Sequence, residues 1–279
     1  MIAHDTLRFV KAQAAGNDFI IFDNRDGKIS PGWKGFVRWL CDRHYGIGAD
    51  GVILVESSER ADFRYRHLNS DGSPAGMCGN GSRCVLRFAH EGLALPAALR
   101  FEMDGVIYRG TVAPGRVTVE FPSLPRVDVA PLVAEAGLYP LGFLDVGVPH
   151  LVLLVDDVDR VDVAELGRRL RHHPAFPFGT NVDFVQVVGR AGLRVRTFER
   201  GVEGETLACG TGAVASAAAT RSAGLVEAEV EVRFPGGTVE VRLCENKVEL
   251  SGQAKLVFRG EIALPRAPWE MDDLDPVQV

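Results

Sequence analysis

The sequence contains two similar stretches that decide its fold: Phe63-Arg-Tyr-Arg leads through a loop into Cys78-Gly-Asn-Gly, and Leu193-Arg-Val-Arg leads through a loop into Cys209-Gly-Thr-Gly. In both stretches apolar and charged residues alternate, which is typical of a half-buried strand. In both, the glycine-rich turn is followed by residues that favour a helix. The two cysteines are separated by almost half of the chain. Two copies of strand, loop, cysteine and helix predict two similar domains with pseudo-twofold symmetry rather than a solenoid, which needs more repeats.

The rest of the chain favours a strand-rich fold of the α/β (α+β) class. Runs of β-branched or aromatic residues between glycine, proline or aspartate predict strands at 19–22, 52–55, 63–68, 106–108, 117–121, 151–155, 184–188, 193–198, 230–234, 239–243 and 256–258. Helices are expected after the two glycine-rich turns, at about 81–91 and 210–223. The second of these is apolar nearly all round, so we expect it to be buried on every side. Two more helices are predicted from their capping patterns, which begin at Ser30-Pro31 and at Asp162.

We expect a domain boundary near Pro122–Pro125, directly after the strand at 117–121. The N-terminal domain, residues 1–121, then carries Cys78, and the C-terminal domain, residues 122–252, carries Cys209. The tail at 265–279 is acidic and contains proline, so we expect it to be peripheral.

The composition excludes several classes of protein. Among 279 residues, 46% are hydrophobic and 24% are charged, and the net charge is −6. A mildly acidic chain lacks the basic surface of a nucleic-acid-binding protein and does not favour an anionic membrane. Its longest aliphatic run, Leu151–Val155, is too short to span a membrane, and the first residues do not form a signal peptide. Because the five cysteines are an odd number without an export signal, we expect free thiols in a cytoplasmic protein.

Cys78 and Cys209 each lie where a loop enters a predicted helix N-terminus. Unpaired N–H groups and the helix dipole favour negative charge there, so we expect the pKa of these thiols to fall toward the working pH. The adjacent glycines let the same N–H groups approach a carboxylate or an oxyanion. If both helix ends meet at one cleft, one thiolate can remove an α-proton while the opposite thiol protonates the other face. This is two-base racemisation or epimerisation, and it needs no pyridoxal phosphate.

A cysteine before a helix is more often a small buried apolar residue. The matched contexts of Cys78 and Cys209 argue against this interpretation for that pair. We accept it for the other three: Cys41, Cys84 and Cys244.

Two further motifs do not indicate a ligand site. Gly46–Gly51 fits the G-x-G-x-x-G pattern, but it follows a predicted helix and precedes a strand, the reverse of a dinucleotide site. His172-His173 has no partner at metal-ligand spacing and fits a solvated helix end. We therefore predict no metal and no cofactor.

Several motifs occur in order along the chain: Ala15-Gly-Asn-Asp-Phe19, Asn69-x-Asp71-Gly72, Cys78-Gly-Asn-Gly-x-Arg83-Cys84, Thr180-Asn-Val-Asp-Phe184, Glu199-Arg-Gly201 and Cys209-Gly-Thr-Gly212. Together they closely resemble the diaminopimelate epimerase family, over about residues 5–264. The resemblance implies two similar domains, each a curved mixed sheet or barrel wrapped around a central helix, with residues 253–264 returning to the first domain. It also implies a cytoplasmic, homodimeric isomerase without a cofactor, which interconverts LL- and meso-diaminopimelate on the route to lysine and peptidoglycan precursors.

The resemblance implies roles for individual residues as well. Cys78 and Cys209 become the acid/base pair, with Cys78 acting on the LL centre. The reacting carboxylate is bound by Gly79, Asn80, Gly210 and Thr211. The distal amino-acid group is bound by Asn17, Asn69, Asn181, Glu199 and Arg200. Polar groups beside the thiols come from His150 and Glu199.

These assignments have simpler alternatives. Asparagine is a common turn residue, which applies to Asn17, Asn69 and Asn181. Arg200 at a strand end can be a solvated charge, and His150 can be a satisfied buried side chain. Where many family members have Gly-Asn-Pro-His, this chain has Gly147-Val-Pro-His150. Val148 cannot donate the hydrogen bond that asparagine supplies to substrate, so the distal end of the substrate could differ.

Three other functions remain open at this point. The first is another racemase of the same fold, acting on proline, hydroxyproline or a different amino acid. The second is a non-catalytic amino-acid-binding protein, or an isomerase that dispenses with the cysteines. The third is a structural module whose buried thiols do not react with alkylating reagents. Arg200, Asn69 and Asn181 favour a second amino-acid head group, which proline-type substrates lack.

Overall fold

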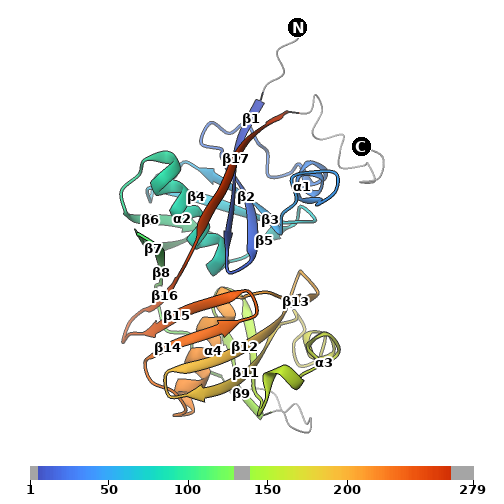
Figure 1. Cartoon of the computed structure of the whole chain (residues 1–279), viewed down its shortest axis with the longest axis vertical. Helices are drawn as coiled ribbons and strands as arrows, with labels where there is room; N and C mark the ends of the chain where they lie inside the picture. Colours follow the sequence, from blue (N-terminus) through green and yellow to red (C-terminus); the bar gives the residue numbers. More distant parts are fainter. Residues whose placement is uncertain (1–5, 129–138, 265–279) are drawn as a thin grey trace. The chain divides into compact units, whose positions relative to one another are not determined.

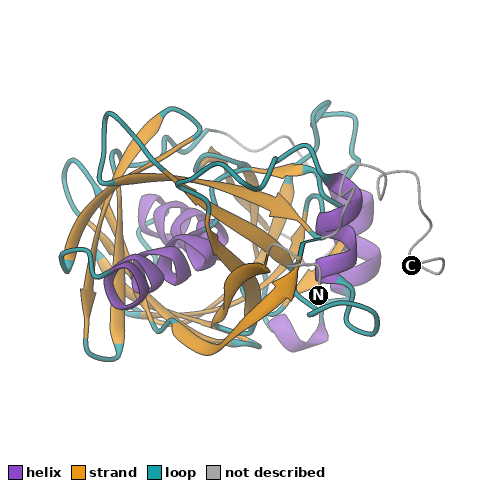
Figure 2. Cartoon of the chain, turned by 90° about the horizontal axis from the view of Figure 1, so that it is seen from above, coloured by secondary structure: helices purple, strands orange, loops and turns teal. Residues whose placement is uncertain are grey.

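The computed structural model describes residues 6–128 and 139–264. By its contacts the chain divides into two compact units. The first comprises Met1–Gly76, Gly81–Val117 and Ala254–Val279, and the second comprises Met77–Asn80 and Thr118–Gln253. Strands form most of the regular structure, so the class is mixed α+β, as predicted (Figure 2). No helix of the described ranges is long and apolar enough to cross a membrane. The tail at 265–279, expected to be peripheral, lies outside the described residues.

The first unit contains a mixed sheet. Its elements are β1 (Thr6–Ala14), β2 (Asn17–Asp23), α1 (Lys34–Cys41), β3 (Gly51–Glu56), β4 (Phe63–Asn69), β5 (Pro74–Ala75), most of α2 (Gly79–Leu93), β6 (Ala98–Met103), β7 (Val106–Ala113), the start of β8 (Arg116–Phe121) and β17 (Lys255–Ala263). β1 pairs antiparallel with both β2 and β17, so the last described strand lies beside the first (Figure 1). Along the rest of the sheet, β2 and β3 are parallel, β3 and β4 antiparallel, β4 and β6 parallel, and β6 and β7 antiparallel.

The second unit repeats this topology. Its elements are the rest of β8, β9 (Tyr139–Asp145), β10 (Pro149–Leu154), the short 3-10 helix η1 (Val158–Arg160), α3 (Val163–Arg171), β11 (Asn181–Gly189), β12 (Gly192–Glu199), β13 (Gly204–Thr206), α4 (Gly210–Ser222), β14 (Glu229–Phe234), β15 (Gly237–Leu243) and β16 (Val248–Gly252). β10 and β11 are parallel, β11 and β12 antiparallel, β12 and β14 parallel, and β14 and β15 antiparallel. The repeat seen around the two cysteines therefore extends to the order and direction of the strands.

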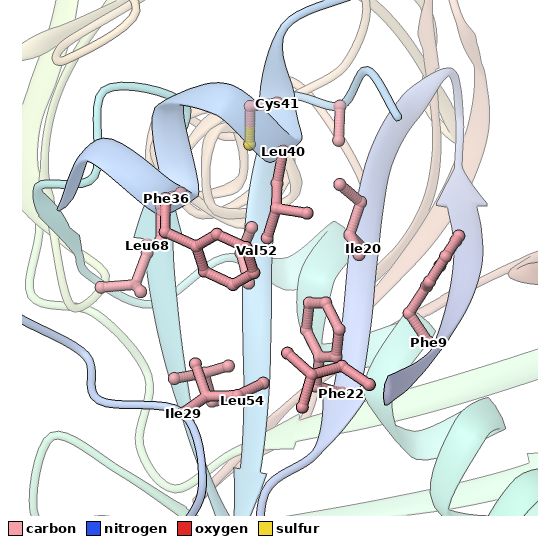
Figure 3. Packing of buried hydrophobic residues seen from close by; sticks show 13 residues of the cluster. Phe9, Ile20, Phe22, Ile29, Phe36, Leu40, Cys41, Val52, Leu54 and Leu68 are labelled. Carbon is pink, nitrogen blue, oxygen red and sulfur yellow. The ribbon is translucent and has the colours of Figure 1, made fainter. Parts of the chain in front are cut away.

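Each unit buries one short amphipathic helix on its sheet. In the first unit, Phe36 and Leu40 of α1 share a buried cluster with Ile20 of β2 and Val52 of β3 (Figure 3). A fully buried side chain of this kind contributes roughly 1.5–3 kcal/mol relative to exposure. In the second unit, α3 packs in the same way against β10, β11 and β12. These clusters fix the strands whose ends carry the candidate site residues.

The helices that follow the two candidate cysteines lie at the centres of their sheets. α4 is buried from Gly210 to Thr220 and contacts β9, β10, β11, β12, β14, β15 and β16. Its side chains are mostly small, which lets strands approach on every side, and the prediction of a helix buried all round is confirmed. α2 is likewise buried from Gly81 to Ala89.

The predicted start of one helix is wrong. α1 begins at Lys34 rather than at Pro31, and its N-cap residue Trp33 makes no side-chain capping bond. The Ser30 hydroxyl instead accepts from the N–H of Gly32 at 3.3 Å, in a turn that precedes the helix. Glycine has a low helix propensity, which favours the turn here. By contrast, the predicted start at Asp162 is confirmed, because its carboxylate accepts from Glu165 N–H at 3.0 Å.

Sequence patterns missed several strands: β1, β5, β6, β9, β13 and β16. The reason is clear for β1, where Lys11 interrupts the apolar pattern. Lys11 is nevertheless buried, and its Nζ lies 2.7 Å from Oδ2 of Asp18 on β2. A buried charged residue breaks the alternation of apolar and polar residues that identifies a strand. Because its ion-pair partner lies on a neighbouring strand, the sequence of the strand itself does not show that the residue can be buried.

Candidate active site

The first residues of α2 and α4 lie against each other within the second unit. A Cβ atom on Gly210 would lie 2.8 Å from Gly79 Cα, and one on Gly79 would lie 2.5 Å from a methyl carbon of Leu250. The Asn80 side chain strengthens this contact, since its Nδ2 donates to the carbonyl of Ala208 at 2.9 Å. At Gly210 the obstructing atom belongs to the backbone, so only glycine fits there, whereas at Gly79 the obstructing methyl group belongs to a leucine side chain. Because these glycines directly follow Cys78 and Cys209, the side chains of the two candidate cysteines are attached to neighbouring parts of the backbone.

Cys209 is the N-cap residue of α4 and is 5% exposed. Its Sγ accepts from Gly212 N–H at 3.3 Å and lies 3.4 Å from the Thr211 hydroxyl oxygen. Burial raises the pKa of Cys209 well above its ordinary value, the charges of Glu199 and Asp183 raise it further, and the bonds from Thr211 and Gly212 lower it. The expectation of a lowered pKa is therefore wrong for Cys209, because loss of water outweighs the helix terminus. The raised pKa favours the thiol form of Cys209.

Three candidate residues lie in one row across neighbouring strands of the second unit. His150 of β10 pairs with Asn181 of β11, and β12 ends at Glu199, one residue beyond the Phe198 that pairs with Val182. Glu199 accepts a hydrogen bond from the Thr206 hydroxyl at 2.9 Å. The sheet register thus gathers side chains that are far apart in the sequence.

The Asn181 side chain is held at both ends. Its Oδ1 accepts from Arg200 N–H at 2.8 Å, and its Nδ2 donates to the carbonyl of Pro149 at 3.0 Å. These bonds tie the start of β10 to the residue after β12. Asn181 therefore positions Arg200, whose guanidinium donates to the carbonyl of Phe178 at 3.2 Å and is partly exposed.

A buried polar chain links β10, β11 and α4. His150 Nδ1 lies 2.7 Å from Asp183 Oδ2, and His150 Nε2 lies 3.0 Å from the Thr211 hydroxyl oxygen. Thr197 donates to the other Asp183 oxygen at 2.7 Å. Asp183 is a site residue that the local pattern does not identify. The signal for it is a carboxylate between Val182 and Phe184 in a buried strand, since such groups are buried only with partners.

The two remaining asparagine candidates belong to the first unit. Asn17 Nδ2 donates to Asp50 Oδ2 at 2.8 Å, and Asn69 Nδ2 donates to the Ser73 hydroxyl at 3.0 Å. Gly51 of β3 pairs with Phe19 on one side and with Asn69 on the other, so both asparagines lie at the same end of this sheet. The turn interpretation holds in part for Asn69, whose carbonyl accepts from Gly72 N–H.

The residues and motifs set aside in the sequence lie away from the two helix starts, except for Cys84 of α2. Gly46–Gly51 lies between α1 and β3. Cys41 and Cys84 are buried, as predicted, but Cys244 is only partly buried, so the prediction of a buried residue is wrong for Cys244. His172 is the C-cap residue of α3 and bonds to Glu203 at 3.2 Å. Within 6–128 and 139–264, no group of three His, Cys, Asp or Glu side chains could hold a metal ion.

The family model for diaminopimelate epimerase matches residues 9–113 and 142–257. The chain belongs to the diaminopimelate epimerase family. Diaminopimelate epimerase of Aquifex aeolicus is 42% identical to it over 275 residues, covering 92% of this chain and 98% of the relative. The enzyme of Chlorobaculum tepidum is 43% identical over 257 residues, covering 90% and 99%. Diaminopimelate epimerases are isomerases, and the resemblance inferred from the motifs is confirmed.

Solved structures share the fold of the diaminopimelate epimerase family at low identity. A hydroxyproline epimerase from Agrobacterium vitis matches with a TM-score of 0.73 and 16% identity, covering 93% of each chain. A PhzF-family phenazine biosynthesis protein of Bacillus anthracis matches with a TM-score of 0.71 and 17% identity, covering 93% of this chain and 100% of the other. At such identities the likeness establishes the fold alone.

Proposed function

We propose that the protein interconverts LL- and meso-diaminopimelate without a cofactor, with Cys78 and Cys209 as alternating base and acid. The observation that carries this proposal is the contact between Gly79 and Gly210, because each glycine starts a helix directly after one of the two cysteines. Two thiols attached to neighbouring parts of the backbone suit a reaction in which one removes a proton from one face of an α-carbon and the other adds a proton to the opposite face. The step would supply lysine and peptidoglycan precursors in the cytoplasm, and we expect a homodimer.

The helix starts supply groups for the reacting end of the substrate. The backbone N–H groups of Gly79, Asn80, Gly210 and Thr211 would bind its carboxylate and stabilise the charge that develops on proton removal. The side chains of Asn80 and Thr211 make bonds inside the protein, which favours their backbone groups for this role.

The distal amino-acid group would be bound by Asn17, Asn69, Asn181, Glu199 and Arg200. Arg200 suits a carboxylate because guanidinium can donate two parallel hydrogen bonds. Val148 lies in the tight connection between β9 and β10, where its carbonyl accepts from Val146 N–H at 3.0 Å. Without the amide present in many relatives, this turn offers only its backbone to substrate.

The protonated state of Cys209 favours a direction for each thiol. A thiol can donate a proton but cannot remove one, so Cys209 is poised to protonate the carbanion that Cys78 generates from the LL isomer. This order agrees with the family pattern, in which the cysteine at the position of Cys78 acts on the LL centre.

Proton NMR of the reduced protein with LL-diaminopimelate in deuterated water tests the proposal. We expect loss of the α-proton signal together with formation of the meso isomer, and no meso isomer with Cys78→Ser or Cys209→Ser. Exchange on trans-4-hydroxy-L-proline but not on diaminopimelate would favour the rival racemase, whose fold the chain shares. Exchange on neither compound would overturn the assignment of the substrate.

A further inference from the structure

We propose that Arg171 and Glu203 are positioning residues, which hold the guanidinium of Arg200 in place to bind the distal carboxylate of the substrate. The inference rests on the proposed function for the identity of this carboxylate. It gives a role to an ion pair outside the residues that bind the substrate themselves. The role concerns the affinity for the distal group and leaves the proton transfer to the cysteines.

The position of Arg200 depends on two segments of the second unit. Its backbone N–H donates to Oδ1 of Asn181, the first residue of β11, at 2.8 Å. Its Nη1 donates to the carbonyl of Phe178, in the loop between α3 and β11, at 3.2 Å. In the part of the chain that the structure describes, this bond uses one of the five N–H donors of the guanidinium, so others remain for two parallel bonds to a carboxylate.

Arg200 begins the turn at 200–203 that connects β12 to β13, and Glu203 closes this turn. Glu203 N–H donates to the carbonyl of Glu199 at 2.9 Å, and Glu203 Oε1 accepts from Gly201 N–H at 3.1 Å. The φ of Glu203 is 56°, in the left-handed region that favours glycine. Backbone strain of this kind often accompanies a functional role of the residue that bears it.

Arg171 joins this turn to the loop that carries Phe178. Its Nε donates to Glu203 Oε1 at 3.0 Å. A Cβ atom on Gly179 would overlap the guanidinium of Arg171, so this side chain lies directly on the backbone next to Phe178. Arg171 is the last residue of α3, and the adjacent Leu170 is buried in the cluster beneath this helix. Arg171 therefore holds together the two segments between which the Arg200 side chain extends.

The surroundings of Glu203 favour its charged form. Although burial raises the pKa of Glu203, Gly201 N–H and the charges of Arg171 and His172 lower it below its ordinary value. His172 Nε2 lies 3.2 Å from the second carboxylate oxygen. The carboxylate is thus ionised at neutral pH and is available to Arg171 over the range in which an enzyme works.

A purely stabilising role is the simpler interpretation of this ion pair. Arg171 and His172 lie at the C-terminal end of α3, where cations interact favourably with the helix dipole. The side chains of Arg171 and Glu203, however, are 15% and 43% exposed, and a partly exposed ion pair contributes little to stability. The two interpretations differ in the quantity that they affect. A stabilising pair affects unfolding, whereas a positioning pair affects KM.

The experiment is steady-state kinetics with LL-diaminopimelate. Glu203→Gln keeps an acceptor for Gly201 N–H but removes the charge that binds Arg171, and Arg171→Gln removes the other half of the pair. We expect each variant to raise KM by about tenfold, the size of one hydrogen bond to a charged group. The value of kcat should change by less than about twofold, because the carboxylate is bound both before and during proton transfer.

Two further variants serve as controls. The double variant of Arg171→Gln and Glu203→Gln should raise KM no further than either single change, since all three proteins lack the same interaction. Glu205→Gln removes a carboxylate of β13 that pairs with Arg196 at 2.7 Å, and it should leave KM near that of the parent.

Glu203→Gly separates positioning from stability. Glycine suits the φ of this residue, so the urea midpoint should stay near or above that of the parent, whereas KM should rise as in Glu203→Gln. Unchanged KM in both Glu203 variants overturns the proposal. Recovery of KM in the double variant relative to Arg171→Gln also overturns it, because Arg171 would then merely keep Glu203 from competing with the substrate for Arg200.

The positioning role can also be tested without the substrate. If the parent protein does not act on diaminopimelate, the proposed function is overturned, and hydrogen–deuterium exchange then tests the positioning role. Arg171→Gln should speed the exchange of Gly201 N–H several-fold, and Glu205→Gln should not. Equal exchange in the parent and in Arg171→Gln overturns the positioning role. In a protein that epimerises diaminopimelate, unchanged KM overturns the positioning role alone.

Discussion

Gly79 and Gly210 approach so closely that the backbone of Gly79 leaves no room for a side chain at Gly210. A Cβ on Gly210 would lie 2.8 Å from Gly79 Cα and 3.2 Å from Asn80 N. The two helix starts can meet in this way only when α4 begins with glycine. Their N–H groups then remain close enough to act on one carboxylate.

Gly210→Ala should therefore separate the two helix starts. We expect kcat/KM to fall by about 100-fold, since a shift of about 1 Å at the reacting groups has effects of this size. The free energy of unfolding should fall by about 1–3 kcal/mol. Gly204→Ala is the matched control, because a Cβ there meets nothing within 4 Å. Activity in Gly210→Ala equal to that of the control would contradict the role of the contact. Steady-state kinetics and urea unfolding provide the measurements.

Cys78→Ser and Cys209→Ser should each lower turnover by about 10²–10⁴-fold, because serine is a much weaker acid and base near neutral pH. The fold should survive, which circular dichroism can check. Cys244→Ser is the control, since Cys244 lies outside both helix starts and its backbone N–H bonds to Lys247 O. Near-native turnover in both serine variants would remove the two-thiol mechanism.

Cys41 should make the folded state sensitive to alkaline pH. Burial raises its pKa to about 12. In the unfolded chain the thiol ionises near its ordinary pKa of about 8.5–9, so the unfolded state loses this proton first and stability falls as pH rises between those values. The expected loss is about 1.4 kcal/mol per pH unit. Urea unfolding at about pH 8 and pH 10 should show a shallower decline in Cys41→Ala. Parallel declines in the two proteins would refute the assignment.

Asp18→Asn should destabilise the first unit strongly. Lys11 is buried and pairs with Asp18 at 2.7 Å. Although burial opposes its charge, bonds from Arg43 and Lys11 keep the pKa of Asp18 below its ordinary value. Leaving the Lys11 charge without this partner should cost about 3–5 kcal/mol. Arg43→Gln, which alters the exposed side of the same network, should cost about 1 kcal/mol or less. Equal losses in the two variants would show that Lys11 does not depend on Asp18.

Local patterns predicted the elements that depend on local interactions. The Asp162 cap, the helices after the glycine-rich turns and most strands follow from spacing and capping, and the structure contains them. Patterns failed where a buried charge has a partner on another strand. Strand β1 was missed because Lys11 interrupts its apolar pattern, and the partner of Lys11 is Asp18 on β2. Asp183 was given no role because its partner, His150, lies on β10.

Residue types at short spacing are enough to recognise the repeated strand, cysteine and helix units, the family, and the candidate residues Cys78 and Cys209. The packing of distant segments brings Gly79 against Gly210, joins His150 to Asp183 and Thr211, and raises the pKa of Cys209. The helix terminus favours a thiolate locally, but the strands around α4 exclude water from the sulfur. Removal of water depends on the whole sheet, so it could not be read from the residues next to Cys209.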